Sequence, residues 1–310
     1  MGIGGEMRAA VAPVRERGVG ATVRGAVERF READGTSHSR ALAYQVVFVV
    51  VSGFIGLVGL ASVLGVGFVR DTVVEMSTRI APGPSSRLLE EAAQQGSSGG
   101  ATAMLLGLGS ALVAGMFAMA QVERSGNRTA GVREDRPGIR RYVVALGLSL
   151  SAGVLIALGL LVLGGGEAIA SGAGWRGSAA TVWTLGRWPL GVVLAAAGLF
   201  LLFVAAPRDR IASTGAIAIG ALVAVTLWVL FTIGLAIYFA VGEGNETYGS
   251  LLAVIALVAW AGASAIALHL GLATAVELDR RGSRRGVVSV PDVGATTADA
   301  VAGDGTRARR

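Results

Sequence analysis

The stretch VREDRPGIRRYVVALGLSLS, Val132 to Ser151, holds four arginines in its first ten positions and then continues into apolar sequence without a break. The arginines could form a nucleic-acid-binding surface, or they could mark the end of a membrane span. A nucleic-acid surface would interleave aromatic residues with the basic ones, but none precedes Tyr142 here. We therefore assign the arginines to membrane topology and contact with anionic lipids, and expect no nucleic-acid partner.

The composition supports the membrane interpretation. Of 310 residues, 53% are hydrophobic and only 15% are charged, whereas about a quarter are charged in soluble domains. The 27 basic residues are all arginine, and the net charge of +6 is what cytoplasmic loops of a membrane protein would add. The chain has no cysteine, which excludes disulfide and zinc-thiolate chemistry.

Six segments are apolar enough to cross a bilayer, which requires about 20 residues per helix. They contain no Asp, Glu or Arg, and they cover residues 41–69, 101–121, 142–164, 188–206, 215–241 and 250–276. The sequence therefore predicts an all-α integral membrane protein, built as a bundle of six transmembrane helices spanning 41–276.

The distribution of arginine predicts the orientation of this bundle. The amino-terminal segment, alternate connections and the carboxy-terminal tail hold 22 arginines, against 5 in the remaining connections. Because arginine concentrates on the cytoplasmic side, both termini are expected to be cytoplasmic. An even number of spans agrees with this arrangement.

Three segments outside the spans carry further expectations. Arg15–Arg31, within the cytoplasmic segment 1–40, has the pattern of an amphipathic helix with Val19, Val23, Val27 and Phe30 on its apolar face. It could lie on the inner leaflet or pack beneath the bundle. In the long outer segment Arg70–Gly100, RLLEEAAQQ predicts a short helix. Residues 277–310 are expected to form a disordered cytoplasmic tail.

No catalytic constellation is visible. The two histidines, His38 and His269, lie on different segments, which disfavours a metal site. A phosphate-binding loop of the Gly-Lys-Ser/Thr type is excluded because the chain has no lysine. The sequence therefore predicts a protein that is not an enzyme and uses no metal or other cofactor.

Small residues recur at every fourth position of several spans, a pattern that lets helix backbones approach closely in lipid. We expect these positions to pack helices together, and the same faces would allow one helix to slide against another. The stripes are Ala103, Gly107, Ala111 and Gly115; Ala145, Ser149, Gly153 and Ala157; Ala216, Gly220 and Ala224; and Ala261 and Ala265.

His269 is the one ionisable residue well inside a predicted span, and it continues the stripe of Ala261 and Ala265 toward Ala273. Tyr44 and Gln45 of the first span fall within about 8 Å of its depth at ~1.5 Å per residue. These side chains could contact a substrate. A neutral histidine bonded to a neighbouring helix is the competing interpretation. Without a carboxylate in any span, ordinary ion-coupled transport is disfavoured.

Four stretches resemble the YihY / virulence factor BrkB family of bacterial inner-membrane proteins, once mislabelled ribonuclease BN. They are FREADGTSHSRALAYQVVF, REDRPGIRRYVVALGLSL, RWPLGVVLAAAGLFLLFVAAPRDR and ETYGSLLAVIALVAW. The resemblance covers about residues 30 to 280. Its landmarks are Arg136, Pro137, Pro207, Tyr248, Gly249 and Trp260.

The chain also departs from the family pattern. Ser52 stands where the family usually has proline, and Gly271 to Ala275 read GLATA in place of a Gly-Ala-Glu-x-Asn signature. Ser52 therefore joins His269, Tyr44 and Gln45 as a candidate substrate contact. The resemblance implies a multi-pass protein of the bacterial inner membrane, with lipid or glycolipid export proposed for some members.

Two functions remain open from the sequence. The first is a transporter or flippase for a lipid or other amphiphile, without its own ATP site, acting in envelope maintenance. The second is a non-transporting envelope scaffold that docks a protein partner through its cytoplasmic termini. Membrane lipids are partners in either case, and an oligomer is compatible with both.

Overall fold

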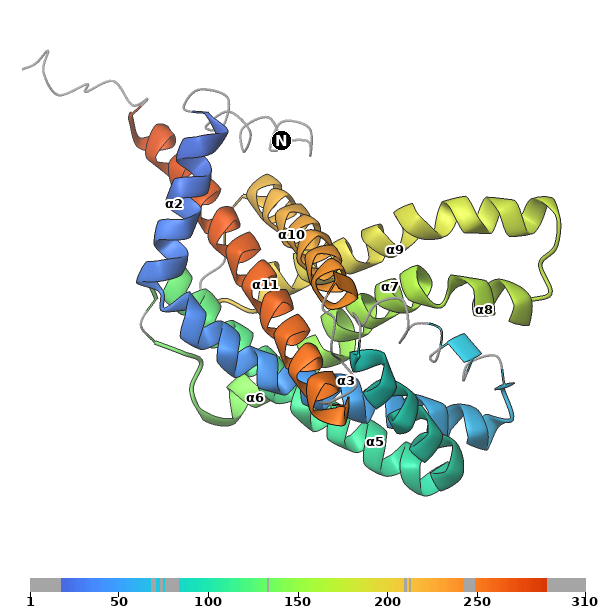
Figure 1. Cartoon of the computed structure of the whole chain (residues 1–310). Helices are drawn as coiled ribbons and strands as arrows, with labels where there is room; N and C mark the ends of the chain where they lie inside the picture. The colour runs from blue at the N-terminus through green and yellow to red at the C-terminus, as the bar shows by residue number, and fades with distance from the viewer. Residues whose placement is uncertain are drawn as a thin grey trace, which may run out of the picture.

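A computed structural model describes residues 18–67, 71, 72, 75, 84–132, 134–208, 211, 213–241 and 249–288. Two groups of helices extend side by side to the right in Figure 1, and the elements within these ranges are helices. They are α2 (Val19–Glu32), α3 (Gly35–Leu64), α5 (Ser85–Ala130), α6 (Gly138–Leu148), η1 (Ser149–Gly153), α7 (Val154–Gly164), α8 (Gly166–Gly172), α9 (Ser178–Ala205), α10 (Thr214–Val241) and α11 (Gly249–Val288).

The all-helical class and the six membrane-length helices are confirmed. Six helices are long and apolar enough to span a bilayer, and their order matches the predicted spans. Their ends differ, because backbone hydrogen bonding continues past the apolar run wherever no residue interrupts it. The spanning helices cover Gly35–Leu64, Ser85–Ala130, Gly138–Gly164, Ser178–Ala205, Thr214–Val241 and Leu251–Asp279.

Helix α5 differs most from its predicted span. The short helix expected in RLLEEAAQQ is present, but it continues into the second span across a kink at Gly100, whose φ of 50° is outside the helical range. At its other end α5 continues to Ala130, where Gly131 in the left-handed conformation ends it. The predicted connection from 122 to 141 is therefore mostly helical, and only residues 131–137 join α5 to α6.

Glycines set the distance between α3 and α5, which lie side by side (Figure 1). A Cβ on Gly107 would overlap the backbone of Gly56, and one on Gly56 would overlap the backbone at Gly107 and Leu108. Gly220 and Gly271 are related in the same way between α10 and α11. Such close backbone contact replaces the hydrophobic effect as a source of packing energy in lipid.

The third span contains a π-helical turn. Helices α6 and α7 are joined by the five residues of η1, Ser149–Gly153. Ser149 of this turn occupies the space beside Gly115 of α5, where a Cβ would overlap its hydroxyl. Single π-helical turns widen a helix locally and often occur at functional positions.

The amphipathic helix is present as α2, and its buried face shares only Phe30 fully with the predicted one. Thr22, Ala26 and Phe30 are buried, while Val19 and Val23 are 67% and 55% exposed. The buried face is the one that α2 turns toward α11, where Arg29 forms an ion pair with Glu277. The helix therefore packs against the bundle and also presents apolar side chains outward.

The predicted tail begins as helix. Helix α11 continues through Val288, so residues 277–288 are not disordered as expected. Two carboxylates fix the first residues of the predicted tail to the bundle. Glu277 pairs with Arg29, and Asp279 accepts a hydrogen bond from the backbone N–H of Ser213 at 2.7 Å. Residues 289–310 lie outside the described residues.

Candidate functional site

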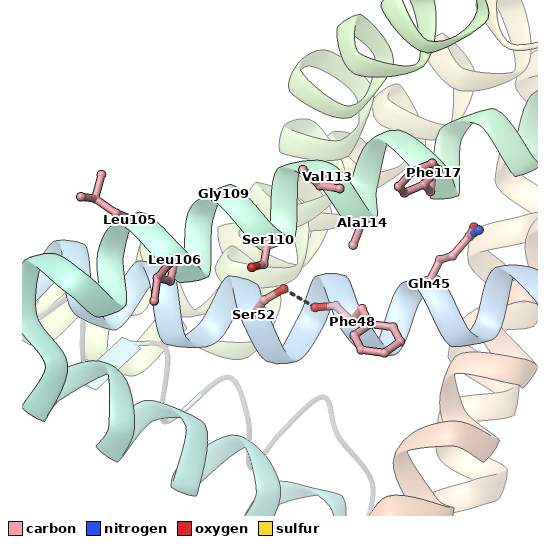
Figure 2. Close-up of a pocket in the computed structure, with 10 residues that line it drawn as sticks. All are labelled: Gln45, Phe48, Ser52, Leu105, Leu106, Gly109, Ser110, Val113, Ala114 and Phe117. Carbon is pink, nitrogen blue, oxygen red and sulfur yellow. Dashed lines mark hydrogen bonds between the residues drawn. The ribbon is translucent and has the colours of Figure 1, made fainter.

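A groove of about 770 Å³ runs between α3 and α5. Figure 2 shows side chains from both helices along it, with Ser52 and Ser110 facing each other across its middle. It is lined by Gln45, Phe48 and Ser52 of α3 and by Leu105, Leu106, Gly109, Ser110, Val113, Ala114 and Phe117 of α5. Most of these side chains are apolar, and Phe48, Leu105 and Leu106 are each 67% exposed.

The polar groups of the groove are few. Ser52 donates a hydrogen bond to the carbonyl oxygen of Phe48 in the preceding turn. The amide oxygen of Gln45 is buried and has no hydrogen-bond partner among the described residues. An enclosed acceptor is costly unless a donor satisfies it, so the Gln45 end of the groove favours a molecule with a donor group. Two of the four candidate contacts thus lie in one groove.

Tyr44 lies elsewhere. It is 64% exposed and lines a smaller cleft of about 270 Å³ between the start of α3 and the middle of α11. The other residues of this cleft are Thr36, Ser39, Arg40, Ala43, Val258, Gly262 and Ile266.

His269 is buried behind the smaller cleft and is 2% exposed. Its Nδ1 lies 2.8 Å from the Ser39 hydroxyl, and its Nε2 lies 2.8 Å from the Ser125 hydroxyl. Because Ser125 donates its own proton to the carbonyl oxygen of Val122, Nε2 must carry the proton and donate to Ser125. Ser39 then donates to Nδ1. The neutral ring is fully satisfied and joins α3, α5 and α11.

The second histidine forms a similar tie. Nδ1 of His38 lies 2.8 Å from the Gln121 side-chain nitrogen, which joins the start of α3 to α5. Among the described residues, no group of three or more His, Asp or Glu side chains could hold a metal ion.

Arg136 is the centre of a polar network at the arginine-rich end. Its side chain donates to the carbonyl oxygens of Ala205, Ala206 and Pro207 at 3.1, 2.6 and 3.1 Å, which satisfies the end of α9. It also pairs with the carboxylate of Glu123 at 3.2 Å. Glu123 is 1% exposed, and its second oxygen accepts from the backbone N–H of Arg136 at 3.0 Å.

Asn127 and Asp135 extend this network. The Asn127 oxygen accepts from the backbone N–H of Arg208 at 2.7 Å, and its nitrogen donates to Asp135 at 3.1 Å. Burial would raise the pKa of Asp135. The hydrogen bond from Asn127 and the charges of Arg128, Arg141 and Arg124 outweigh it and hold this pKa below its ordinary value.

Hydropathy alone does not predict this network. Glu123 and Asn127 follow the second apolar run by a few residues, where hydropathy predicts a connecting loop. The available signal was sequence spacing: Gln121, Ser125 and Thr129 continue the helical period past the apolar run, and all are buried. Arg187, one residue outside the predicted span 188–206, also lies inside a helix and is buried.

Five of the six landmark residues lie in the described part of the chain. Arg136 and Pro207 are in contact, and Pro137 has the extended conformation (φ −73°, ψ 143°) that precedes α6. Trp260 is buried, stacks edge-on with Trp228 and donates to the Thr232 hydroxyl at 3.2 Å. Gly249 begins α11, while Tyr248 lies outside the described residues.

The remaining packing positions lie at helix contacts. A Cβ placed on Gly153 would lie 3.6 Å from the Met119 side chain. A Cβ placed on Gly53 would lie 4.0 Å from the Cβ of Ala111. Gly107, Gly115, Ser149 and Gly220 lie in the contacts described above.

Comparison with known families agrees with these landmarks. Residues 26–289 match the sequence model of the family described as virulence factor BrkB, which is most of the chain. The chain belongs to the virulence factor BrkB family. No curated protein and no solved structure matches it. Family membership, together with six spanning helices, indicates that this BrkB-family chain is a multi-pass inner-membrane protein.

Proposed function

We propose that this BrkB-family protein binds a lipid or other amphiphile in the α3–α5 groove and moves it between leaflets. The observation that carries the proposal is the groove itself: about 770 Å³ of space on the side of two spanning helices, with apolar walls and a few polar groups. An acyl chain fits apolar walls, and Ser52, Ser110 and the unsatisfied oxygen of Gln45 can bond a polar head group.

Two features of the helices favour movement. The contact between Gly56 and Gly107 is mainly backbone against backbone, and small-residue faces of this kind would allow one helix to shift along the other. The π-helical turn η1, which packs against α5 at Gly115, is a second point where the bundle departs from regular packing.

The proposal includes an orientation and an energy source. The arginine-rich end faces the cytoplasm, with both termini inside, in accordance with the positive-inside rule. The protein is not an enzyme and uses no cofactor. Since the sequence has no phosphate-binding loop, movement is passive or driven by a partner protein.

A lipid-movement assay tests the proposal. The purified protein is reconstituted into vesicles with a fluorescent phospholipid, and loss of outer-leaflet fluorescence after adding dithionite reports exchange between leaflets. Ala114→Trp fills the groove and should abolish exchange. Leu230→Trp, at a 58% exposed position on α10, is the matched control and should leave exchange unchanged.

Native mass spectrometry of protein extracted gently from its own membrane supplies the substrate class. One lipid class retained far above its abundance in the membrane, and lost in Ala114→Trp, supports the groove as a binding site. Vesicles that exchange no lipid, alone or with cell extract, would contradict the transport proposal.

The scaffold is a second candidate, supported by the exposed Val19 and Val23 on α2. Such side chains can bind a partner helix or the membrane surface. If the protein is a scaffold, Val19→Asp with Val23→Asp, or deletion of 289–310, should abolish partner pull-down from solubilised membranes. The double variant should leave lipid exchange unchanged in either case, because α2 lies outside the groove.

A further inference from the structure

Arg187 carries a buried charge that no carboxylate of the described residues pairs with. It lies on α9 and is 4% exposed. Its Nε and Nη1 atoms have no hydrogen-bond partner among the described residues. Arg187 also takes part in none of the ion pairs found among those residues. A buried charge is strongly unfavourable unless it is paired and hydrogen-bonded. The Glu75 carboxylate lies at the start of α8, where it accepts from the backbone N–H groups of Glu167 and Ala168. A further anion at the guanidinium would stabilise the buried charge of Arg187.

The surroundings of Arg187 hold it in place. Its guanidinium occupies the space beside Gly166 at the start of α8, where a Cβ would overlap it. The Trp183 indole donates to the carbonyl oxygen of Gly166 at 2.6 Å, which fixes this backbone. The Arg187 guanidinium carbon also lies 5.5 Å from the centre of the Trp188 ring, a cation–π distance.

The depth of Arg187 matches a lipid phosphate. It precedes Ala205, the last residue of α9 at the arginine-rich end, by 18 positions, which is about 27 Å along a helix. A hydrocarbon core is about 30 Å thick, so Arg187 lies near the opposite boundary of the bilayer. Trp175, Trp183 and Trp188 gather at the same end, as aromatic residues do at membrane interfaces.

The face beside Arg187 is suited to acyl chains. Val182 and Leu185 are 70% and 71% exposed, and Trp188 is 55% exposed, at successive three-residue steps along α9. A soluble anion would gain nothing from these apolar side chains. A phospholipid would place its phosphate at the guanidinium and its chains along this strip.

We propose that Arg187 binds the phosphate of an anionic phospholipid in the leaflet opposite the arginine-rich end. A head group without an ammonium fits best, because a second cation would offset the attraction to the guanidinium. This site lies on α9, apart from the α3–α5 groove, and requires no movement of lipid.

Thermal unfolding of the full chain in uncharged detergent tests the site, with and without phosphatidylglycerol. Without lipid, Arg187→Gln should unfold at a higher temperature than the native protein, because the variant removes an uncompensated charge. With phosphatidylglycerol, the native protein should gain several degrees and Arg187→Gln should not. In native mass spectrometry, Arg187→Gln should retain about tenfold less phosphatidylglycerol than the native protein, which corresponds to a loss of about 1.4 kcal/mol in binding free energy.

Arg176→Gln is the matched control, since Arg176 is an exposed arginine at the same end. It should behave as the native protein does. An equal loss of phosphatidylglycerol in Arg176→Gln would show general charge attraction and overturn the site. The site would also be overturned if phosphatidylcholine or inorganic phosphate raised the unfolding temperature of the native protein as much as phosphatidylglycerol does.

A purely structural arginine gives a different pattern. Arg187→Gln would then unfold at a lower temperature than the native protein under both conditions. If Arg187→Gln does not fold, the native protein still tests the site. An unfolding temperature of the native protein that phosphatidylglycerol does not raise would contradict the proposed site. Gly166→Ala, which displaces the guanidinium without removing it, should also weaken that response.

Discussion

Arg136 connects the α5–α6 loop to α5 and α9 through one side chain, so its removal should be costly. Arg136→Ala leaves Glu123 buried without its ion pair and three carbonyl oxygens at the end of α9 without a donor. Breaking a buried pair by removing one partner typically costs about 3–5 kcal/mol. We expect a loss near the lower end of this range, measured as the free energy of unfolding in detergent.

Arg208→Ala is the control for that measurement. The Arg208 side chain pairs at 3.0 Å with Glu134, whose side chain is 82% exposed. Solvent screening reduces such a pair to about 0–1 kcal/mol. Equal losses in Arg136→Ala and Arg208→Ala would contradict a structural role for the buried network.

Asp135 should make stability depend on pH in the acid range. Its pKa is held below the ordinary value of 3.8, so the folded state favours its charged form. This contribution is fully present above pH about 4 and is lost as the pH falls through the lowered pKa. Unfolding temperatures of the native protein and Asp135→Asn, measured from pH 6 downward, should therefore converge below pH 4. A constant difference would contradict the lowered pKa.

The sequence predicts the burial of some residues but not their hydrogen-bond partners. The burial of His269 followed from its place in a small-residue stripe, because a residue on the packed face of a span must point into the bundle. Its hydrogen bonds to Ser39 and Ser125 depend on tertiary contacts that periodicity does not encode. Hydropathy does not reveal Glu123 and Arg187, because both are charged and lie just outside the apolar runs, although both are buried.

At the scale of the helix, Gly107 should be required for the contact of α3 with α5. Gly107→Ala places a Cβ against the backbone of Gly56, which cannot move without separating the helices. Overpacking of this kind typically costs about 1–3 kcal/mol. Gly109→Ala, two residues away on the same helix with no atom within 4 Å of its Cβ, is the control. Unfolding temperatures should fall for Gly107→Ala and stay level or rise for Gly109→Ala.

The existence and order of the spanning helices were predictable because a bilayer imposes a minimum apolar length. Their ends were not. Helix α5 continues for nine residues beyond the predicted span, and α9 begins ten residues before it. Polar residues can continue a helix that packs on its neighbours. Glu123 and Asn127 do so in α5, where both are buried. The kink at Gly100 and the π-helical turn η1 had no sequence signal beyond glycine and serine content.

At the scale of the whole molecule, the two ends of the bundle differ in chemistry. One end is tied by Arg136 and the hydrogen bonds and ion pairs around it, which join α5, α9 and the loop before α6. The other holds Arg187 and three tryptophans. The first end is suited to rigidity and the second to contact with lipid. The groove lies on the α3–α5 pair between them.

This asymmetry predicts which end faces the cytoplasm, and labelling of single cysteines measures it. The chain has no cysteine, so every introduced thiol is unique. Ser37, at the start of α3, and Ser178, at the start of α9, are both exposed and lie at opposite ends of spanning helices. Because arginine concentrates on the cytoplasmic side, a membrane-impermeant maleimide added to intact spheroplasts should label Ser178→Cys and spare Ser37→Cys. Both should be labelled after lysis. Labelling of Ser37→Cys alone before lysis would reverse the orientation and move the proposed Arg187 lipid site to the cytoplasmic leaflet.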